Sequence, residues 1–163
     1  MLSIRNASVA DIPLIRELTF AVWPQTYSNI ISKEQINFML EMMFSQASLQ
    51  KQMTEEGCTF IIVYDDDTAV AFAAYHKTKP QIFKLDKIYI VSAQQGKGTG
   101  KFIINYIIGE IKKHDARAIQ LQVNRHNNAK LFYEKIGFRI IDTADFDIGN
   151  GYFMNDYVME LPL

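Results

Sequence analysis

The sequence predicts one domain of the α/β (α+β) class, in which strands and helices follow the order β-α-α-β-β-β-α-β-α-β-β. Three observations predict it. The 163 residues are 48% hydrophobic and 21% charged, a globular profile with enough apolar material for one core. Residues 85–91 are rich in β-branched and aromatic residues, as a buried strand is. Residues 101–113 repeat apolar side chains at helical spacing. Because no linker or repeat interrupts residues 1–163, we expect a single domain.

The first half of the chain predicts a strand, two helices and a hairpin. Residues 2–6 form the strand. Ser8, with Asp11 three residues later, is typical of a helix N-cap, and Trp23-Pro24 is expected to end that helix. Ser32 begins a second capping box. The other elements predicted here are a helical turn at 48–54 and a hairpin of strands 60–64 and 69–77.

The second half predicts alternating strands and helices and then a closing hairpin. Each strand is recognised by β-branched and aromatic residues and each helix by its apolar spacing. The predicted elements are a strand at 85–91, a helix at 101–113, a strand at 118–123, a helix at 128–136, and hairpin strands at 139–147 and 152–160.

The overall composition excludes several classes of protein. Seventeen basic and eighteen acidic residues give a formal charge of −1, so we expect no nucleic-acid partner. A single cysteine, Cys58, excludes an internal disulfide framework and is typical of a reducing compartment. No apolar run reaches the roughly 20 residues that span a bilayer. We therefore expect a cytoplasmic protein with no membrane partner and no metal cofactor.

A glycine-dense turn lies between strand 85–91 and helix 101–113. Such a turn leaves backbone N–H groups unpaired at the positive end of the helix dipole, where a pyrophosphate can bind. A dinucleotide fingerprint would need glycine at Lys101, and a P-loop would need Ser or Thr at Phe102 and glycine at Gln95. Neither familiar motif is present.

Two segments resemble one known family. Gln95, Gly98 and Gly100 match the pattern Gln-x-x-Gly-x-Gly, which resembles the acetyl-coenzyme A pyrophosphate loop of the GCN5-related N-acetyltransferases, the GNAT superfamily. Residues 129–138 read Ala-x-x-x-Tyr-x-Lys-x-Gly-Phe and resemble a second block of that family. The resemblance implies a GNAT fold, with a mixed and mostly antiparallel sheet between helices, and direct acetyl transfer from acetyl-coenzyme A to a primary amine.

The same resemblance implies where the co-substrate binds. Strand 89–91 is expected to part from strand 121–123 and to offer backbone groups to the pantetheine arm. Many family members carry an asparagine at the position of His126, so its role either moves to a nearby asparagine, Asn127 or Asn124, or is dropped. Asn127 is equally a candidate N-cap of the helix that follows. The implied cofactor contacts are Tyr89, Ile90, Val91, Gln95, Gly96, Lys97, Gly98, Thr99, Gly100, Lys101, Asn127 and Tyr133.

Tyr133 matches the family tyrosine that acts as general acid toward the leaving thiolate. Its ordinary pKa near 10 keeps it protonated at neutral pH, as a donor must be. An aliphatic ammonium acceptor must lose a proton before it attacks, and Asp86 and His76 are candidate bases. A water molecule that relays the proton to solvent would need neither.

The acceptor is predicted only by class. Residues 140–163 contain five acidic residues and no Lys or Arg, which favours a cationic amine such as a polyamine. Phe20, Trp23 and Tyr27 are candidates for an aromatic wall, and the expected substrate contacts are Trp23, Tyr27 and His76. The chain is also loosely similar to bacterial spermidine and spermine acetyltransferases. A protein N-terminus or lysine as acceptor, a non-catalytic acyl-coenzyme A sensor, and a homodimer all stay open.

Overall fold

A seven-stranded sheet runs through the computed structural model, which describes residues 1–163. The strand order is β1-β2-β3-β4-β5-β7-β6, and every neighbouring pair is antiparallel except β4 and β5. The predicted mixed and mostly antiparallel sheet is therefore confirmed. The strands are β1 (Leu2–Asn6), β2 (Thr59–Asp65), β3 (Thr68–Lys79), β4 (Ile82–Ile90), β5 (Ala118–Asn124), β6 (Arg139–Gly149) and β7 (Tyr152–Pro162).

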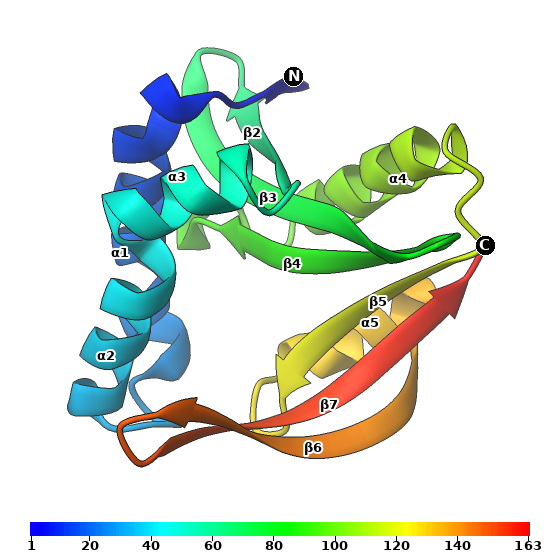
Figure 1. Cartoon of the computed structure of the whole chain (residues 1–163). Coiled ribbons are helices and arrows are strands. Elements are labelled where there is room, and N and C mark those ends of the chain that lie inside the picture. Colours follow the sequence, from blue (N-terminus) through cyan, green and yellow to red (C-terminus); the bar gives the residue numbers. More distant parts are fainter.

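Helices cover both faces of the sheet (Figure 1). The first three helices pack on one face through a core that includes Trp23, Phe44 and Phe72. Helices α4 and α5 pack on the other face through a core that includes Ile107 and Tyr133. None of these helices has both the length and the apolar composition needed to cross a bilayer. They are α1 (Ile12–Tyr27), α2 (Lys33–Phe44), α3 (Gln46–Thr54), α4 (Thr99–Lys112) and α5 (Ala129–Ile136), with 3-10 turns at Val9–Asp11 and Ser92–Gln94.

The two central strands pair over only part of their length. β4 and β5 are in register from Ile82 opposite Ala118 to Leu85 opposite Leu121, and no further. Beyond that point β5 stays paired with β7 as far as Asn124, whereas β4 continues beside β3. The sheet consequently opens into a V toward α1 and α2 (Figure 1). Backbone groups of β4 that face this opening have no strand partner.

A bulge in β4 lies at the base of the opening. Ala74 is opposite Lys87 while the next residue, Tyr75, is opposite Leu85, so Asp86 is the extra residue of the bulged strand. A bulge bends a strand and redirects side chains, and bulges are frequent beside active sites. Here Asp86 and Lys87 both reach toward the side of the sheet that α1–α3 cover, since both line the same cavity beside those helices.

Helix α1 runs further than predicted. The expectation that Trp23-Pro24 ends this helix is wrong, since α1 continues to Tyr27 with Pro24 inside it. Proline removes one backbone donor, but the following turn is intact, with the Ser28 N–H donating to the Pro24 carbonyl at 3.1 Å. Trp23 is 1% exposed and packs its ring 5.5 Å from that of Phe44. Packing of this face therefore outweighs the cost of the proline.

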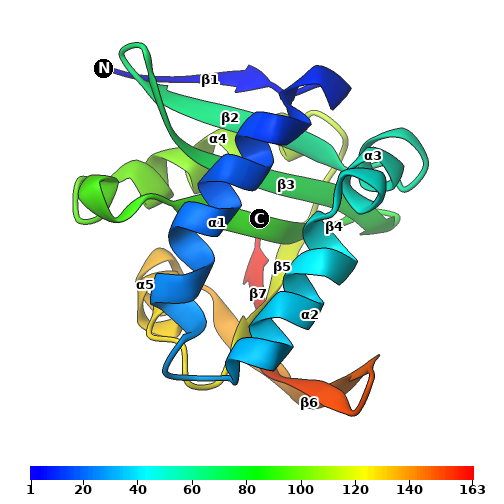
Figure 2. The ribbon, with the colours of Figure 1, turned by 90° about the vertical axis from the view of Figure 1, so that its left-hand side faces the viewer.

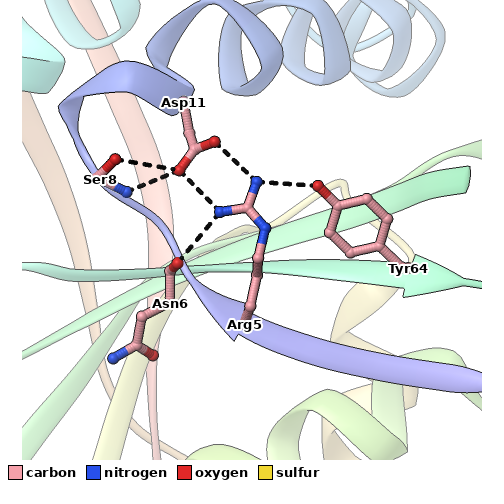
Figure 3. Close-up of polar contacts among 5 residues, drawn as sticks. All are labelled: Arg5, Asn6, Ser8, Asp11 and Tyr64. Atoms are coloured by element: carbon pink, nitrogen blue, oxygen red, sulfur yellow. Dashed lines mark hydrogen bonds and ion pairs between the residues drawn. The ribbon is translucent and has the colours of Figure 1, made fainter. Parts of the chain in front are cut away.

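The predicted capping box of Ser8 and Asp11 is present, but Ser8 caps the 3-10 turn that leads into α1, and Asp11 is the N-cap of α1 itself. The box belongs to a larger polar cluster (Figure 3). The Ser8 N–H donates to Asp11 Oδ2 at 2.8 Å. The Arg5 guanidinium donates to both oxygens of Asp11, at 2.8 and 2.9 Å, and to the Tyr64 hydroxyl at 3.0 Å. This guanidinium lowers the pKa of Asp11 to about 2. The cluster joins β1 and β2 to the start of α1 and so fixes the direction in which α1 crosses the sheet.

Two glycines of α4 should respond oppositely to substitution by alanine. A Cβ at Gly100 would lie 2.7 Å from Cζ of Phe132 on α5, whereas a Cβ at Gly109 would meet nothing within 4 Å. We expect Gly100→Ala to lower the free energy of unfolding by about 1–2 kcal/mol through overpacking. Gly109→Ala should raise it by about 0.5–1 kcal/mol, because glycine weakens a helix interior. Urea denaturation measures both, and equal shifts of the same sign would contradict the assigned packing.

Candidate active site

The glycine loop presents a row of free backbone donors at the start of α4. No backbone N–H of residues 96–101 donates to another backbone carbonyl; the next donor is Phe102, to the Gly98 carbonyl at 3.1 Å. Gly98 is the N-cap of α4 and has φ +80°, a left-handed conformation that favours glycine. Six consecutive free donors at the positive end of a 14-residue helix are an arrangement that can accept a diphosphate.

Neighbouring side chains hold this loop in place. Gln94 is buried and donates to Asp65 Oδ2 at 3.3 Å and to Thr99 Oγ1 at 3.2 Å. Gln95 donates from Nε2 to the Ile90 carbonyl at 3.4 Å. Lys97 and Lys101 are exposed and add positive charge beside the free donors. The loop is thus fixed to the ends of β2 and β4, while its own N–H groups stay free.

A cavity of about 250 Å³ lies on the α1–α2 side of the opening between β4 and β5. It draws side chains from both central strands, from α1 and α2, and from the β6–β7 hairpin. Its lining residues include Trp23 and Tyr27 of α1, Met39 of α2, Asp86 and Tyr89 of β4, Gln122 and Asn124 of β5, and Phe153 and Asp156 of β7. Of the predicted substrate contacts, Trp23 and Tyr27 therefore line a common cavity.

Aromatic rings form one wall of this cavity. The Trp23 ring is centred 4.5 Å from that of Tyr27 and 6.0 Å from that of Tyr89. Burial raises the pKa of Tyr27 to about 12 and that of Tyr89 well above its usual value. Both hydroxyls are consequently protonated at neutral pH. Phe20 lies elsewhere, 46% exposed with the Arg16 guanidinium over its ring, so the expectation that it joins this wall is wrong.

Tyr133 lies on α5 and does not line the cavity between α1, α2 and the parted strands. It is 8% exposed and packs between Phe132 and Phe138, with ring centres 5.4 and 5.7 Å away. Burial, and then the nearby Tyr27, raise the pKa of Tyr133. A phenol in this environment keeps its proton across the neutral range, which is the state a general acid needs.

Two carboxylates reach the cavity from opposite sides of the opening. Asp86 contacts His76 behind it, with Oδ2 2.7 Å from Nδ1, and the Cys58 thiol donates to the same oxygen at 3.8 Å. His76 does not line the cavity itself. Asp156, on β7 opposite Asn124, is 2% exposed, and burial raises its pKa to about 6. At pH 7 the Asp156 carboxyl is therefore mostly ionised inside the protein.

The acidic residues of the closing hairpin do not all face the cavity. Asp145 is paired with Arg125, and Asp147 accepts the Gly149 N–H at 2.9 Å. Both lie on β6, which is the edge strand, and neither lines the cavity. The expectation of an acidic groove along this hairpin is corrected to the single buried carboxylate of Asp156. Only the register of β7 against β5 distinguishes Asp156 from its neighbours, and the sequence does not reveal that register.

Asn127 has a structural contact that the sequence left open. Its Oδ1 accepts the Ala129 N–H at 2.9 Å, at the start of α5. Asn128 takes the N-cap position, one residue later than expected. The carboxamide oxygen of Asn127 is thus engaged in helix capping.

The chain has the sequence features of a known enzyme family as well as this loop, opening and cavity. A model of the acetyltransferase (GNAT) domain matches residues 28–161. The chain belongs to the GNAT family. GNAT enzymes are N-acetyltransferases that use acetyl-coenzyme A as co-substrate, so the predicted enzyme class and co-substrate are confirmed.

Individual proteins that resemble this GNAT chain have low sequence identity to it. An uncharacterised N-acetyltransferase of Mycobacterium bovis is 25% identical over 130 residues, 79% of this chain and 83% of its own length. Mycothiol acetyltransferase of Corynebacterium glutamicum is 26% identical over 146 residues, and the match covers 86% of this chain but 48% of that protein. The PaiA N-acetyltransferase of Thermoplasma acidophilum, solved with coenzyme A, has a TM-score of 0.83 at 23% identity, covering 100% of this chain and 99% of that one. This last likeness shows the fold.

Proposed function

We propose that this GNAT enzyme acetylates a primary amine of a small cationic molecule, with a polyamine as the leading candidate. The observation that carries this proposal is the pair of carboxylates, Asp86 and Asp156, that reach one small cavity beside the parted strands. Opposed negative groups in a partly dehydrated cavity attract a cation with several ammonium groups. The aromatic wall of Trp23 and Tyr27 suits the methylene segments between those groups.

Contacts between α2 and the β6–β7 hairpin beside the cavity favour a small acceptor over a protein. The Gln35 side chain of α2 donates from Nε2 to the Phe153 carbonyl of β7 at 2.8 Å. Phe38 of α2 packs 5.2 Å from the ring of Tyr152. Figure 2 shows the start of α2 beside the hairpin of β6 and β7. Gln35 and Phe153 both line the cavity, so this contact closes part of its wall, whereas a polypeptide acceptor would need an open groove.

On this proposal the acetyl donor lies between the glycine loop and the parted strands. The N–H groups of residues 96–101 would hold its pyrophosphate, and those backbone groups of residues 89–91 that face the opening would hold its pantetheine arm. Acetyl-coenzyme A supplies an activated thioester. Tyr133 would give its phenolic proton to the leaving sulfur, as the family resemblance implies. The chain itself binds the donor mainly through backbone atoms, so the contacting side chains need not be unusual.

The amine must be neutral when it attacks. For an ordinary ammonium with a pKa near 10.4, reaching the neutral form at pH 7 costs about 4.6 kcal/mol. Holding the reactants together contributes about 7–11 kcal/mol, which exceeds that cost. The role of Asp86 as a base stays a prediction, since a relaying water serves as well.

The test is a panel of amines assayed for thiol release with acetyl-coenzyme A. The panel includes spermidine, a matched monoamine, lysine-containing peptides and peptides with a free α-amino group. We expect the polyamine to give the highest kcat/KM. A preference for either class of peptide would overturn the small-molecule proposal. If none of the amines in the panel causes thiol release, acetyl transfer itself is overturned in favour of a non-catalytic sensor.

Asp156→Asn should weaken the acceptor and not the donor. We expect KM for the polyamine to rise about 10–100-fold at pH 7.5, since a hydrogen bond to a charged group is worth about 1.5–3 kcal/mol. In the unsubstituted enzyme KM should rise as the pH falls through about 6, because the Asp156 carboxylate becomes protonated there. Asp156→Asn should remove that dependence. Asp145→Asn, outside the cavity, is the matched control and should leave KM unchanged.

Stability supplies a second measure for the same variant. The pKa of Asp156 is raised in the fold from its ordinary 3.8 to about 6, so the folded chain favours the protonated carboxyl. This contribution to stability is fully present below pH 3.8 and is lost as the pH rises through about 6. Asp156→Asn should therefore be more stable than the unsubstituted chain at pH 7.5 and no more stable at pH 4. A loss of stability at pH 7.5 would show that the carboxylate has a structural partner and contradict its assignment to the acceptor.

A further inference from the structure

Three side chains with metal-binding atoms meet on the side of the sheet that α1–α3 cover. They are Cys58 immediately before β2, His76 on β3 and Asp86 at the bulge of β4. Cys58 Sγ, His76 Nδ1 and a carboxylate oxygen of Asp86 all lie within 4.8 Å of one another. We propose that Cys58, His76 and Asp86 form a binding site for a Zn²⁺ ion, which is separate from the acetyl-donor site and is not a cofactor of the reaction.

The donor set matches the chemistry of zinc. Thiolate, imidazole and carboxylate are the three kinds of ligand that Zn²⁺ takes in proteins, at about 2.0–2.3 Å in tetrahedral sites. These bond lengths set the ligand atoms about 3.3–3.6 Å apart. The observed separations are 2.7 Å from His76 Nδ1 to Asp86 Oδ2 and 3.8 Å from Cys58 Sγ to the same oxygen. Adjustments of about 1 Å, within the range of side-chain rotation, convert one arrangement into the other.

The backbone holds the three residues together independently of any ion. Thr59 is opposite Tyr75 in the antiparallel β2–β3 ladder. Cys58, one residue before Thr59, and His76, one residue after Tyr75, therefore lie at the same end of the ladder. The bulge in β4 supplies the third residue, because Asp86 is the position without an opposite partner on β3. A site on three adjacent strands is preorganised, which reduces the entropy lost on metal binding.

The local charge also suits a divalent cation. An ionised thiol and carboxylate would together balance the two charges of Zn²⁺. Lys87 is the nearest basic neighbour on β4, but its ammonium donates to Gln52 Oε1 at 2.6 Å and lies over the rings of Phe44 and Phe60. Lys84, which lines the acceptor cavity, and Glu56, which precedes Cys58 by two residues, are the other charged groups around the cluster. Asp86 forms its ion pair with His76 and none with a lysine.

Two cavities give solvent access to the cluster. Asp86 lines the acceptor cavity, and Cys58 lines a second cavity of about 370 Å³ between β1, the end of α3 and the start of β2. An ion can therefore enter beside Cys58 without passing the acceptor. The fourth coordination position is left for water, as in zinc sites with three protein ligands.

Metal binding is tested directly on the full chain, kept reduced, by titration with Zn²⁺ in a calorimeter and with Co²⁺ in a spectrophotometer. We expect one ion per chain, with the charge-transfer absorption of a thiolate–Co²⁺ bond and the visible bands of tetrahedral Co²⁺. Cys58→Ser, His76→Asn and Asp86→Asn should each weaken binding at least 100-fold. His114→Asn and His126→Asn are matched controls, and neither should change it.

The outcomes separate the site from alternatives. Binding without a thiolate band, or binding that the controls weaken as much as the ligand variants do, would overturn the site. The absence of stoichiometric binding to the unsubstituted chain would also overturn it. Should one variant fold poorly, as judged by its thermal unfolding, the absorption spectrum of the unsubstituted chain and the remaining two variants still decide the matter.

An effect on catalysis follows, and this step rests on the proposed acetyl transfer. A Zn²⁺ ion on Asp86 would compete with the cationic acceptor for that carboxylate. We expect Zn²⁺ to raise KM for the amine in the unsubstituted enzyme and to have at least 100-fold less potency in Cys58→Ser. Equal inhibition of both proteins would contradict the competition. If no amine is acetylated, the proposed function fails while the binding titrations still test the metal site.

Discussion

Gly98→Val should weaken the binding of acetyl-coenzyme A at least 100-fold, which corresponds to about 2.7 kcal/mol. Gly98 has φ +80° at the N-cap of α4, and a β-branched residue held in that conformation costs about 1–3 kcal/mol. A Cβ here would meet nothing within 4 Å, so the effect comes from backbone conformation and not from a clash. The loop relaxes, and its row of free N–H groups no longer converges. Isothermal titration calorimetry measures the change.

Gly57→Val is the matched control for that prediction. Gly57 has φ +72° and equally open surroundings, but it lies between α3 and β2, away from the loop. Both variants should lose similar amounts of folding stability, while only Gly98→Val loses donor affinity. Unchanged affinity in Gly98→Val, or an equal loss in Gly57→Val, would remove the diphosphate assignment of residues 96–101.

Tyr133→Phe should lower kcat by about 100-fold to 10,000-fold, the range that a positioned general acid contributes. The dissociation constant of acetyl-coenzyme A should change less than twofold, because the phenyl ring keeps its packing against Phe132 and Phe138. The pKa of Tyr133 is raised above its usual value of 10, so its ionisation should produce no fall in kcat between pH 7 and 9. Steady-state kinetics and calorimetry measure the two quantities separately.

Tyr106→Phe on α4 removes a phenolic oxygen elsewhere in the same core and should leave kcat unchanged. If Tyr133→Phe also leaves kcat unchanged, the tyrosine is a packing residue only. If kcat and donor affinity fall together, the substitution has disturbed the donor site, and the role of proton donor is lost with it.

The donor half of the site could be predicted from sequence because its chemistry is local. Residues 95–101 are consecutive, and a glycine turn before a helix exposes N–H groups wherever it occurs. The role predicted for Tyr133 comes from the family resemblance of one contiguous block, residues 129–138. The family resemblance implies that β4 and β5 part, and the register shows where the parting begins, after Leu85 and Leu121.

The acceptor half could be predicted only in part because it depends on register. Asp86 faces the cavity through a bulge that inserts one residue into β4, and neither strand carries a sequence signal for it. Asp156 is buried, while Asp145 and Asp147 are exposed on the neighbouring strand, although all three look alike in sequence. Pro24 was misassigned for a related reason, since the packing of Trp23 against Phe44 involves residues 21 positions apart.

The short ladder between β4 and β5 has a thermodynamic consequence. Only four residue pairs join β4 to β5, and past them the facing edges of these two strands have no strand partner. The amide-containing pantetheine arm of a bound donor would hydrogen-bond to these edges as an added strand does. Binding of acetyl-coenzyme A would then stabilise the fold by mass action, so the melting temperature of the enzyme should rise with the concentration of acetyl-coenzyme A.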